Sequence, residues 1–301
     1  MYRTKIYSVF LAVIFINAGP AVANETRVLA TIQPVQLIVS ELLRGLDEES
    51  SSLLPAGMTP HDYALKISDM KRVKAAKLML WLGPEVEPYL VKMMGNKSSI
   101  EALNIRMLEG IEHLPLRSLA GGHHHHREES ARDPHTWLAP NTALQIATVL
   151  VARLSKVDAQ NVAIYQQNLA SFKQNMEKLD RYKGVFLHSG AEFVVHHDAY
   201  QYLEAFMGLT PSAVVTVEPE VSPGVRHLTE VAQTIKAKQI SCLVGGPALP
   251  PRLAFFLFKG RAADSYRVIK LDPLAGGGFE SYSAFMEDLA SRLAQCVSGE
   301  S

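Results

Sequence analysis

The sequence predicts an α/β protein with two similar lobes, each containing a mainly parallel sheet flanked by helices. Short apolar runs alternate with helix-like segments in the first half of the chain, and the same alternation returns in the second half. Between them lies a long segment, residues 158–184, whose apolar residues recur at helical spacing. We therefore expect lobes at 24–157 and 185–301, joined by one long connecting helix, with the ligand site in the cleft between the lobes.

The first lobe is predicted from apolar runs and the residues that punctuate them. Pro34 suits the first turn of a helix, and Ser68-Asp69 resembles a helix cap. Residues 116–133 are rich in Gly, Ser, His, Arg and Glu without periodicity, which indicates a surface loop. The predicted strands are 27–32, 52–54 and 78–82; the predicted helices are 34–44, 70–77, one after Pro84, and 141–154.

The second lobe repeats this plan after the connecting helix. Its apolar runs are bounded by Pro, Gly and Asp, as in the first lobe. The predicted strands are 192–196, 213–217, 240–244 and 267–271, and the predicted helices are 199–207, 223–238 and 282–295.

The N-terminus predicts a cleaved signal peptide, residues 1–23. Arg3 and Lys5 precede an apolar run at 9–16, and the Ala-Val-Ala at 21–23 is the small-x-small pattern of a cleavage site. The apolar run is shorter than the roughly 20 residues that a membrane-spanning helix needs. No Cys stands at the cleavage point to carry a lipid, so we expect a periplasmic or secreted mature protein without a membrane span.

Charge and cysteine content narrow the class further. Lys plus Arg and Asp plus Glu both total 30, which gives no support to nucleic-acid binding. Cys242 and Cys296 are the two cysteines, and in an oxidising compartment an even pair predicts a disulfide, worth on the order of 4 kcal/mol for a loop of this length. Two buried free thiols are the alternative; neither number nor spacing suits a cysteine-based zinc site.

Two of the eleven histidines stand where predicted strands end. His61, in LPAGMTPHDYALKISDM, follows a probable strand, and His197, in VVHHDAYQYL, lies at a strand-to-helix junction. Asp198 is expected to fix His197 by capping that helix. Loops at the carboxyl ends of strands are where α/β proteins bind ligands. Surface or ordinary core positions are expected for His113, His188 and His227.

Two further residues complete a candidate metal set. His135 lies in DPHTWLAP, where Asp133 is placed to orient its imidazole, and Asp272 follows a predicted strand in VIKLDPLAGG. With His61 and His197 this gives three imidazoles plus a carboxylate or water, a tetrahedral set that zinc accepts, whereas manganese prefers more oxygen ligands. On chemistry alone it is one arrangement among many.

The stretch GGHHHHR carries four consecutive histidines, His123, His124, His125 and His126. Neighbouring residues in a flexible loop cannot point four rings at one centre without a large ordering cost. We interpret this run as an accessory loop that collects metal weakly near the cleft mouth; a purely solvated loop is the alternative.

Several motifs together resemble one family, the periplasmic zinc-binding proteins of high-affinity zinc ABC importers. The resemblance covers nearly the whole mature chain, with the motifs in the family's order. These are HDYALKISDMKRVKAAKLMLWLGPEVEPYL, DPHTWLAP, HHDAYQYLEAFMGL, EVSPG and IKLDPLAGG. By resemblance His61, His135 and His197 bind the metal, His196 is a neighbour of the site, and Asp272 completes it or lies close by.

The resemblance also implies a role without catalysis. It suggests a monomer that carries zinc as its transported ligand to an inner-membrane permease driven by a cytosolic ATPase. A comparable C-terminal cysteine pair occurs in zinc-specific relatives. Two departures matter: Pro60 stands where some relatives have a possible fourth ligand, Glu, and 245–247 read Gly-Gly-Pro where many have Glu-Pro-Gln.

Three alternatives stay open at this stage. The same fold could serve manganese or ferrous iron, although a third histidine at 197 argues against a site of two histidines and two carboxylates. A zinc hydrolase would need an open coordination position and a nearby base, and no Glu accompanies these histidine motifs as in HExxH. An adhesin-like second role at the cell surface is also compatible with the sequence.

Overall fold

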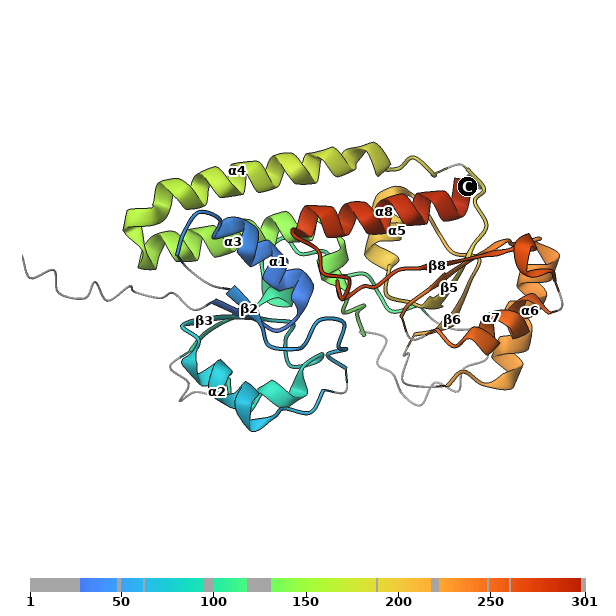
Figure 1. Ribbon diagram of the computed structural model, residues 1–301, viewed down its shortest axis with the longest axis horizontal. Coiled ribbons are helices and arrows are strands. Elements are labelled where there is room, and N and C mark those ends of the chain that lie inside the picture. Colours follow the sequence, from blue (N-terminus) through green and yellow to red (C-terminus); the bar gives the residue numbers. More distant parts are fainter. Residues whose placement is uncertain are drawn as a thin grey trace, which may run out of the picture.

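The computed structural model describes residues 28–47, 50–61, 63–94, 100–117, 131–187, 189–217, 222–247, 249–259 and 261–298. The predicted signal peptide, 1–23, and the histidine run, 123–126, lie outside these residues. Two sheets lie next to each other, and the longest helices run along one side of them (Figure 1). Within the described segments, no helix combines the length and apolar character that crossing a membrane requires.

The N-terminal sheet has four parallel strands in the order β2-β1-β3-β4. Its strands are β1 Val28–Ala30, β2 Ser50–Ser52, β3 Leu78–Trp81 and β4 Glu101–Asn104. Strands β1 and β3 are buried throughout, as expected for the centre of a parallel sheet covered on both faces. The helices beside them are α1 Gln33–Leu42 and α2 Ile67–Ala75.

The C-terminal sheet repeats this topology, with four parallel strands in the order β6-β5-β7-β8. Its strands are β5 Val194–His197, β6 Ala213–Thr216, β7 Cys242–Gly245 and β8 Arg267–Lys270. The accompanying helices are α5 Gln201–Met207, α6 Val225–Ala237 and α7 Pro251–Phe258. The predicted two-sheet α/β architecture is therefore confirmed.

Three long helices, α3 Pro140–Val157, α4 Val162–Lys178 and α8 Tyr282–Ser298, form the layer above both sheets in Figure 1. Helix α4 packs against α3, α1 and α8. Short 3₁₀ turns, Ala159–Asn161 and Leu179–Tyr182, flank α4, so the predicted connecting segment 158–184 is one central helix with tighter ends. The buried Phe172 and Tyr282 rings, 5.9 Å apart, belong to the core between α4 and α8.

The disulfide between Cys242 and Cys296 is confirmed and joins β7 to α8, with the Cα atoms 5.7 Å apart. It ties the last helix to a central strand of the C-terminal sheet. The two sulfur positions lie deep in the core, since both residues are at most 3% exposed.

Two local predictions are wrong, and two elements were not predicted. No α-helix follows Pro84; the segment forms turns and a 3₁₀ turn at Pro88–Leu90. Ser68 does not cap α2, because the helix already begins at Ile67 and the Asp69 side chain accepts from the Lys66 backbone N–H at 2.9 Å. Strand β4 and helix α7 were not expected.

Candidate metal centre

A pocket of about 290 Å³ brings together the four residues predicted as metal ligands. His61 reaches it from the loop after β2, and His197 from the end of β5. His135 comes from the segment before α3, and Asp272 from the loop after β8. His61, His197 and Asp272 stand at or after the carboxyl ends of parallel strands, so the pocket lies where parallel α/β sheets usually bind ligands.

The three imidazoles are close neighbours. The ring centroids of His135 and His197 are 5.1 Å apart, and those of His61 and His135 are 5.8 Å apart. Imidazoles that share a zinc ion at about 2.0 Å from each nitrogen have centroids on the order of 5 Å apart. No three His, Cys, Asp or Glu groups of the described chain converge closely enough to form a ready-made ligand cluster. Shared coordination would therefore need a small approach of the rings.

His135 is oriented by Asp133, as predicted. The Nδ1 atom of His135 lies 2.8 Å from Asp133 Oδ1, which also accepts the His135 backbone N–H at 2.8 Å. Asp133 is 1% exposed, and its Oδ2 accepts from Gln201 Nε2 at 3.0 Å. A neutral ring held this way carries its proton on Nδ1 and keeps the Nε2 lone pair for a metal, the usual second partner of a metal-binding histidine.

His197 carries the clearest sign of a missing partner. Its Nε2 is buried and has no hydrogen-bond partner among the described residues. Burial, followed by the proximity of His135 and His61, lowers the pKa of His197 to about 2. The ring is therefore neutral at physiological pH, and a buried, unpaired nitrogen is costly unless a ligand binds it.

His61 is different, because its side chain is exposed. It sits on the loop between β2 and α2, and its backbone N–H donates to Thr59 Oγ1 at 3.2 Å. The loop contains Gly57, whose φ of +76° only glycine adopts readily.

Both carboxylate oxygens of Asp272 accept hydrogen bonds from backbone N–H groups of its own loop. Oδ1 accepts from the Leu274 backbone N–H at 2.9 Å, and Oδ2 accepts from that of Gly276 at 2.8 Å. A Cβ at Gly276 would lie 2.6 Å from Asp272 Oδ2 and 3.0 Å from the Cα of Gly57. The loop after β8 and the loop after β2 thus meet through two glycines. Each carboxylate oxygen retains a second lone pair that could face a metal.

His196 also lines this pocket and is 6% exposed; burial lowers its pKa. Two of the other predicted bystanders, His113 and His227, lie outside this pocket. His113 Nε2 pairs with the Arg106 carbonyl at 2.8 Å, and His227 Nε2 with the Val214 carbonyl at 2.9 Å. His188 lies outside the described residues.

Asp198 does not cap α5, so this prediction is wrong. The residue preceding α5 is Tyr200, and it has no side-chain cap. Asp198 Oδ1 instead accepts from Arg117 Nη1, and Glu204 Oε2 accepts from Arg117 Nη2, both at 2.5 Å. Glu204 stands in the HHDAYQYLEAFMGL motif, but Arg117 lies 87 residues before it, so no local signal paired the two.

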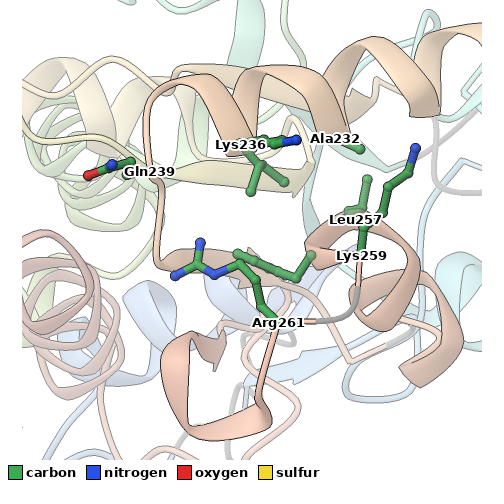
Figure 2. A pocket seen from close by; sticks show the side chains of 8 residues that line it. Ala232, Lys236, Gln239, Leu257, Lys259 and Arg261 are labelled. Carbon is green, nitrogen blue, oxygen red and sulfur yellow. The ribbon is translucent and has the colours of Figure 1, made fainter.

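A second and larger hollow lies between α6 and α7 and shares no lining residue with the histidine pocket (Figure 2). Its volume is about 560 Å³, and its polar rim carries Lys236, Gln239, Lys259 and Arg261. Its described lining contains no His, Cys, Asp or Glu, so it offers a cation no ligands. The histidine pocket differs from this hollow because His61, His135, His197 and Asp272 line it.

Comparison with known proteins agrees with this geometry. The sequence profile of the family described as "Zinc-uptake complex component A periplasmic" (ZnuA) matches residues 28–296. The chain belongs to this family. The match spans both sheets and all four pocket residues.

Individual relatives are similar along their whole length. The high-affinity zinc uptake system protein ZnuA of Yersinia pestis is 28% identical over 309 residues, covering 95% of this chain and 96% of the relative. Among solved structures, a crystal structure of ZnuA superposes with a TM-score of 0.74 at 23% identity, covering 91% of this chain and 99% of that one. The binding protein FpvC of Pseudomonas aeruginosa, solved with Mn²⁺, gives a TM-score of 0.75 at 18% identity, covering 92% and 100%. At these identities the structures establish the shared fold.

Proposed function

We propose that this protein captures zinc in the periplasm and delivers it to the permease of an ABC importer. One observation carries the proposal: three imidazoles from separate parts of the chain line one pocket, and one of them, His197, has a buried Nε2 without a partner. Family membership supports the same conclusion, since relatives across the family are named for high-affinity zinc uptake.

Zinc is the cargo in this proposal. His61, His135 and His197 bind it through neutral nitrogens, and Asp272 or a water molecule fills the fourth position. The Asp133 hydrogen bond fixes the His135 ring before metal arrives, which lowers the ordering cost of binding. The protein binds and releases its ligand without catalysing a reaction.

The remaining parts of the proposal concern export and partners. Residues 1–23 are removed as a signal peptide, and the mature chain acts as a monomer. Its lobes are 24–157 and 185–301, with 158–184 between them. The loaded protein docks on an inner-membrane permease driven by a cytosolic ATPase.

Manganese is the second candidate, because a Mn²⁺-bound protein shares this fold. The donor set disfavours it, since three nitrogens and at most one carboxylate suit zinc better than manganese. Metal analysis of protein purified without added metal would decide, and dominant manganese or iron would reverse the assignment.

Titration calorimetry with zinc tests the proposed ligands. His61→Ala, His135→Ala and His197→Ala are expected to weaken binding, whereas His113→Ala is a matched control because that ring pairs with a backbone carbonyl. Unchanged zinc affinity in all three pocket variants would reject the proposal.

A further inference from the structure

The interlobe arm, residues 114–117 and 131–133, belongs to the first half of the chain and contacts the second half. Its two segments are linked by the isolated β-bridge between Pro115 and Arg132, and the Leu116 backbone N–H donates to the Ala131 carbonyl at 3.2 Å. The arm packs on helix α5 of the C-terminal half. There Tyr202 OH donates to the Asp133 carbonyl at 3.0 Å, and Gln201 Nε2 donates to the Pro115 carbonyl at 2.9 Å.

Arg117 is the last residue of the first segment of this arm, 114–117. Its guanidinium group lies between two buried carboxylates. Its two terminal nitrogens each contact a different acid, Asp198 and Glu204, whose side chains are 2% and 0% exposed. The remaining oxygen of each acid, Asp198 Oδ2 and Glu204 Oε1, has no hydrogen-bond partner within the described segments. Both carboxylates therefore depend on Arg117, because buried charges without a partner are strongly destabilising.

These two acids bracket the segment that follows His197. Asp198 is the next residue after His197, and Glu204 lies on α5. The same helix carries Gln201, which donates to Asp133, the residue that orients His135. A guanidinium fork is rigid and directional, so holding both acids fixes the turn between β5 and α5.

We propose that Arg117 is a positioning residue of the metal centre, which clamps Asp198 to Glu204 and thereby aims the His197 and His135 rings at the cargo. This inference rests on the zinc-binding function proposed above. Arg117 itself does not line the pocket, so its effect on metal binding is exerted through these neighbours.

The test compares Arg117→Met with Arg153→Met in the full mature chain. Arg153 makes an exposed ion pair with Glu101 at 3.1 Å, remote from the pocket, and serves as the matched control. Zinc affinity is measured by competition with a chromophoric chelator, and the visible spectrum of the cobalt(II)-loaded protein reports ligand geometry. Loss of an outer contact of this kind typically weakens metal affinity about 10- to 100-fold. We expect this loss of zinc affinity and a changed cobalt spectrum in Arg117→Met, and neither change in Arg153→Met.

Two more variants separate positioning from folding. Arg117→Lys is expected to recover only part of the affinity, since one ammonium cannot reproduce the fork. The double variant Arg117→Met/Glu204→Gln removes one positive and one negative charge, so it is expected to fold. Asp198 still lacks its donor in this variant, so the reduced zinc affinity is expected to persist. Zinc affinity can therefore be measured in the double variant even if Arg117→Met fails to fold.

The outcomes are distinct. Wild-type zinc affinity and cobalt spectrum in the double variant would overturn the inference, as would a lowered thermal midpoint in Arg117→Met with unchanged metal binding. Failure of the wild-type protein itself to bind zinc would instead reject the proposed function.

Discussion

His135 and His197 on one side of the pocket, and His61 on the other, are supported in different ways. His135 is 4% exposed and held by Asp133, and the His197 Nε2 is enclosed by protein. His61 is exposed and stands on a loop shaped by Gly57. The difference indicates that protein contacts hold His135 and His197, the deep side of the site, whereas the exposed His61, the outer side, is less constrained.

Lowering the pH should have the largest effect on zinc affinity. The size of this effect also tests whether the His197 ring is buried and neutral. Imidazoles bind metal only when neutral, so affinity falls as pH drops. Burial and the nearby His135 and His61 hold the pKa of His197 at about 2, so no proton competes at that ring between about pH 5 and 7. At most two of the three rings then exchange a proton for zinc.

The measurement is a series of chelator competitions at different pH values. The logarithm of affinity should change by no more than about two per pH unit in this window, because each exchanged proton contributes a slope of one. A slope of three would show that His197 titrates like an exposed ring and would erase the contrast between the two sides.

Alanine substitution of one histidine at a time should show how much each side of the site contributes to zinc affinity. Structural zinc sites bind with about 10–16 kcal/mol shared among four ligands, so one ligand contributes on the order of 3 kcal/mol, or about 100-fold. We expect at least this loss for His135→Ala and His197→Ala, and a smaller loss for His61→Ala, where water can replace the exposed ring. Competition titrations give the order, and a larger loss at His61 would break the comparison.

Asp133→Asn should weaken the deep side without removing a ligand. An amide presents a donor or a weaker acceptor to His135 Nδ1, so the ring loses its fixed tautomer, and affinity should fall about 10- to 100-fold. Asp158→Asn is the matched control, since this buried carboxylate accepts from Tyr165 OH at 2.7 Å far from the pocket. Equal zinc affinity in Asp133→Asn and wild type would contradict the prediction.

Gly276→Ala addresses the outer side, where the two loops meet. The added methyl would lie within 3.0 Å of Asp272 Oδ2 and Gly57 Cα, too close for a real Cβ, so the loops must separate. We expect zinc affinity to fall several-fold, on the scale of about 1 kcal/mol for modest loop strain. Gly224→Ala, with nothing within 4 Å of the new methyl, should bind normally.

Deleting His123 to His126 should have the smallest effect. The tight site is complete without them, so its affinity should be unchanged, while any additional weak zinc stoichiometry falls. Calorimetry over a wide zinc range separates the two classes of site. Loss of the tight site would show that the run contributes a ligand.

Much of the fold could be predicted because local signals agreed with it. The apolar runs at 78–82 and 240–244 became β3 and β7, close to the predicted bounds. The missed elements carried conflicting signals. Strand β4, Glu101–Asn104, is partly exposed and lacks β-branched residues, and α7 begins at the second of two consecutive prolines, a pattern typical of a loop.

The expected helix after Pro84 failed for a related reason. Pro88 disfavours helical backbone in the residue before it, and the buried Glu87 carboxylate accepts the Leu82 backbone N–H at 2.6 Å, which holds the segment as a turn. Burial raises the pKa of Glu87 to about 7, a tertiary effect without a sequence signature.

The candidate site likewise contains residues that the sequence predicts and a contact that it does not. The histidines could be found because each lies within a recognisable motif, and His61 and His197 also stand at strand ends. The link from Arg117 to Asp198 and Glu204 could not, since it forms only when the interlobe arm packs on α5. Periodicity and spacing describe neighbours along the chain, whereas this contact depends on how the two halves meet.

The position of Trp137 has a further consequence. Its ring centroid is 5.1 Å from that of His135, the side chain is fully buried, and its Nε1 donates to the Pro273 carbonyl at 2.8 Å beside Asp272. The chain has only two tryptophans, and one of them touches both a proposed ligand and the loop of another. The protein thus contains a built-in fluorophore beside the proposed metal ligands, and zinc loading can be followed by ultraviolet emission without any label.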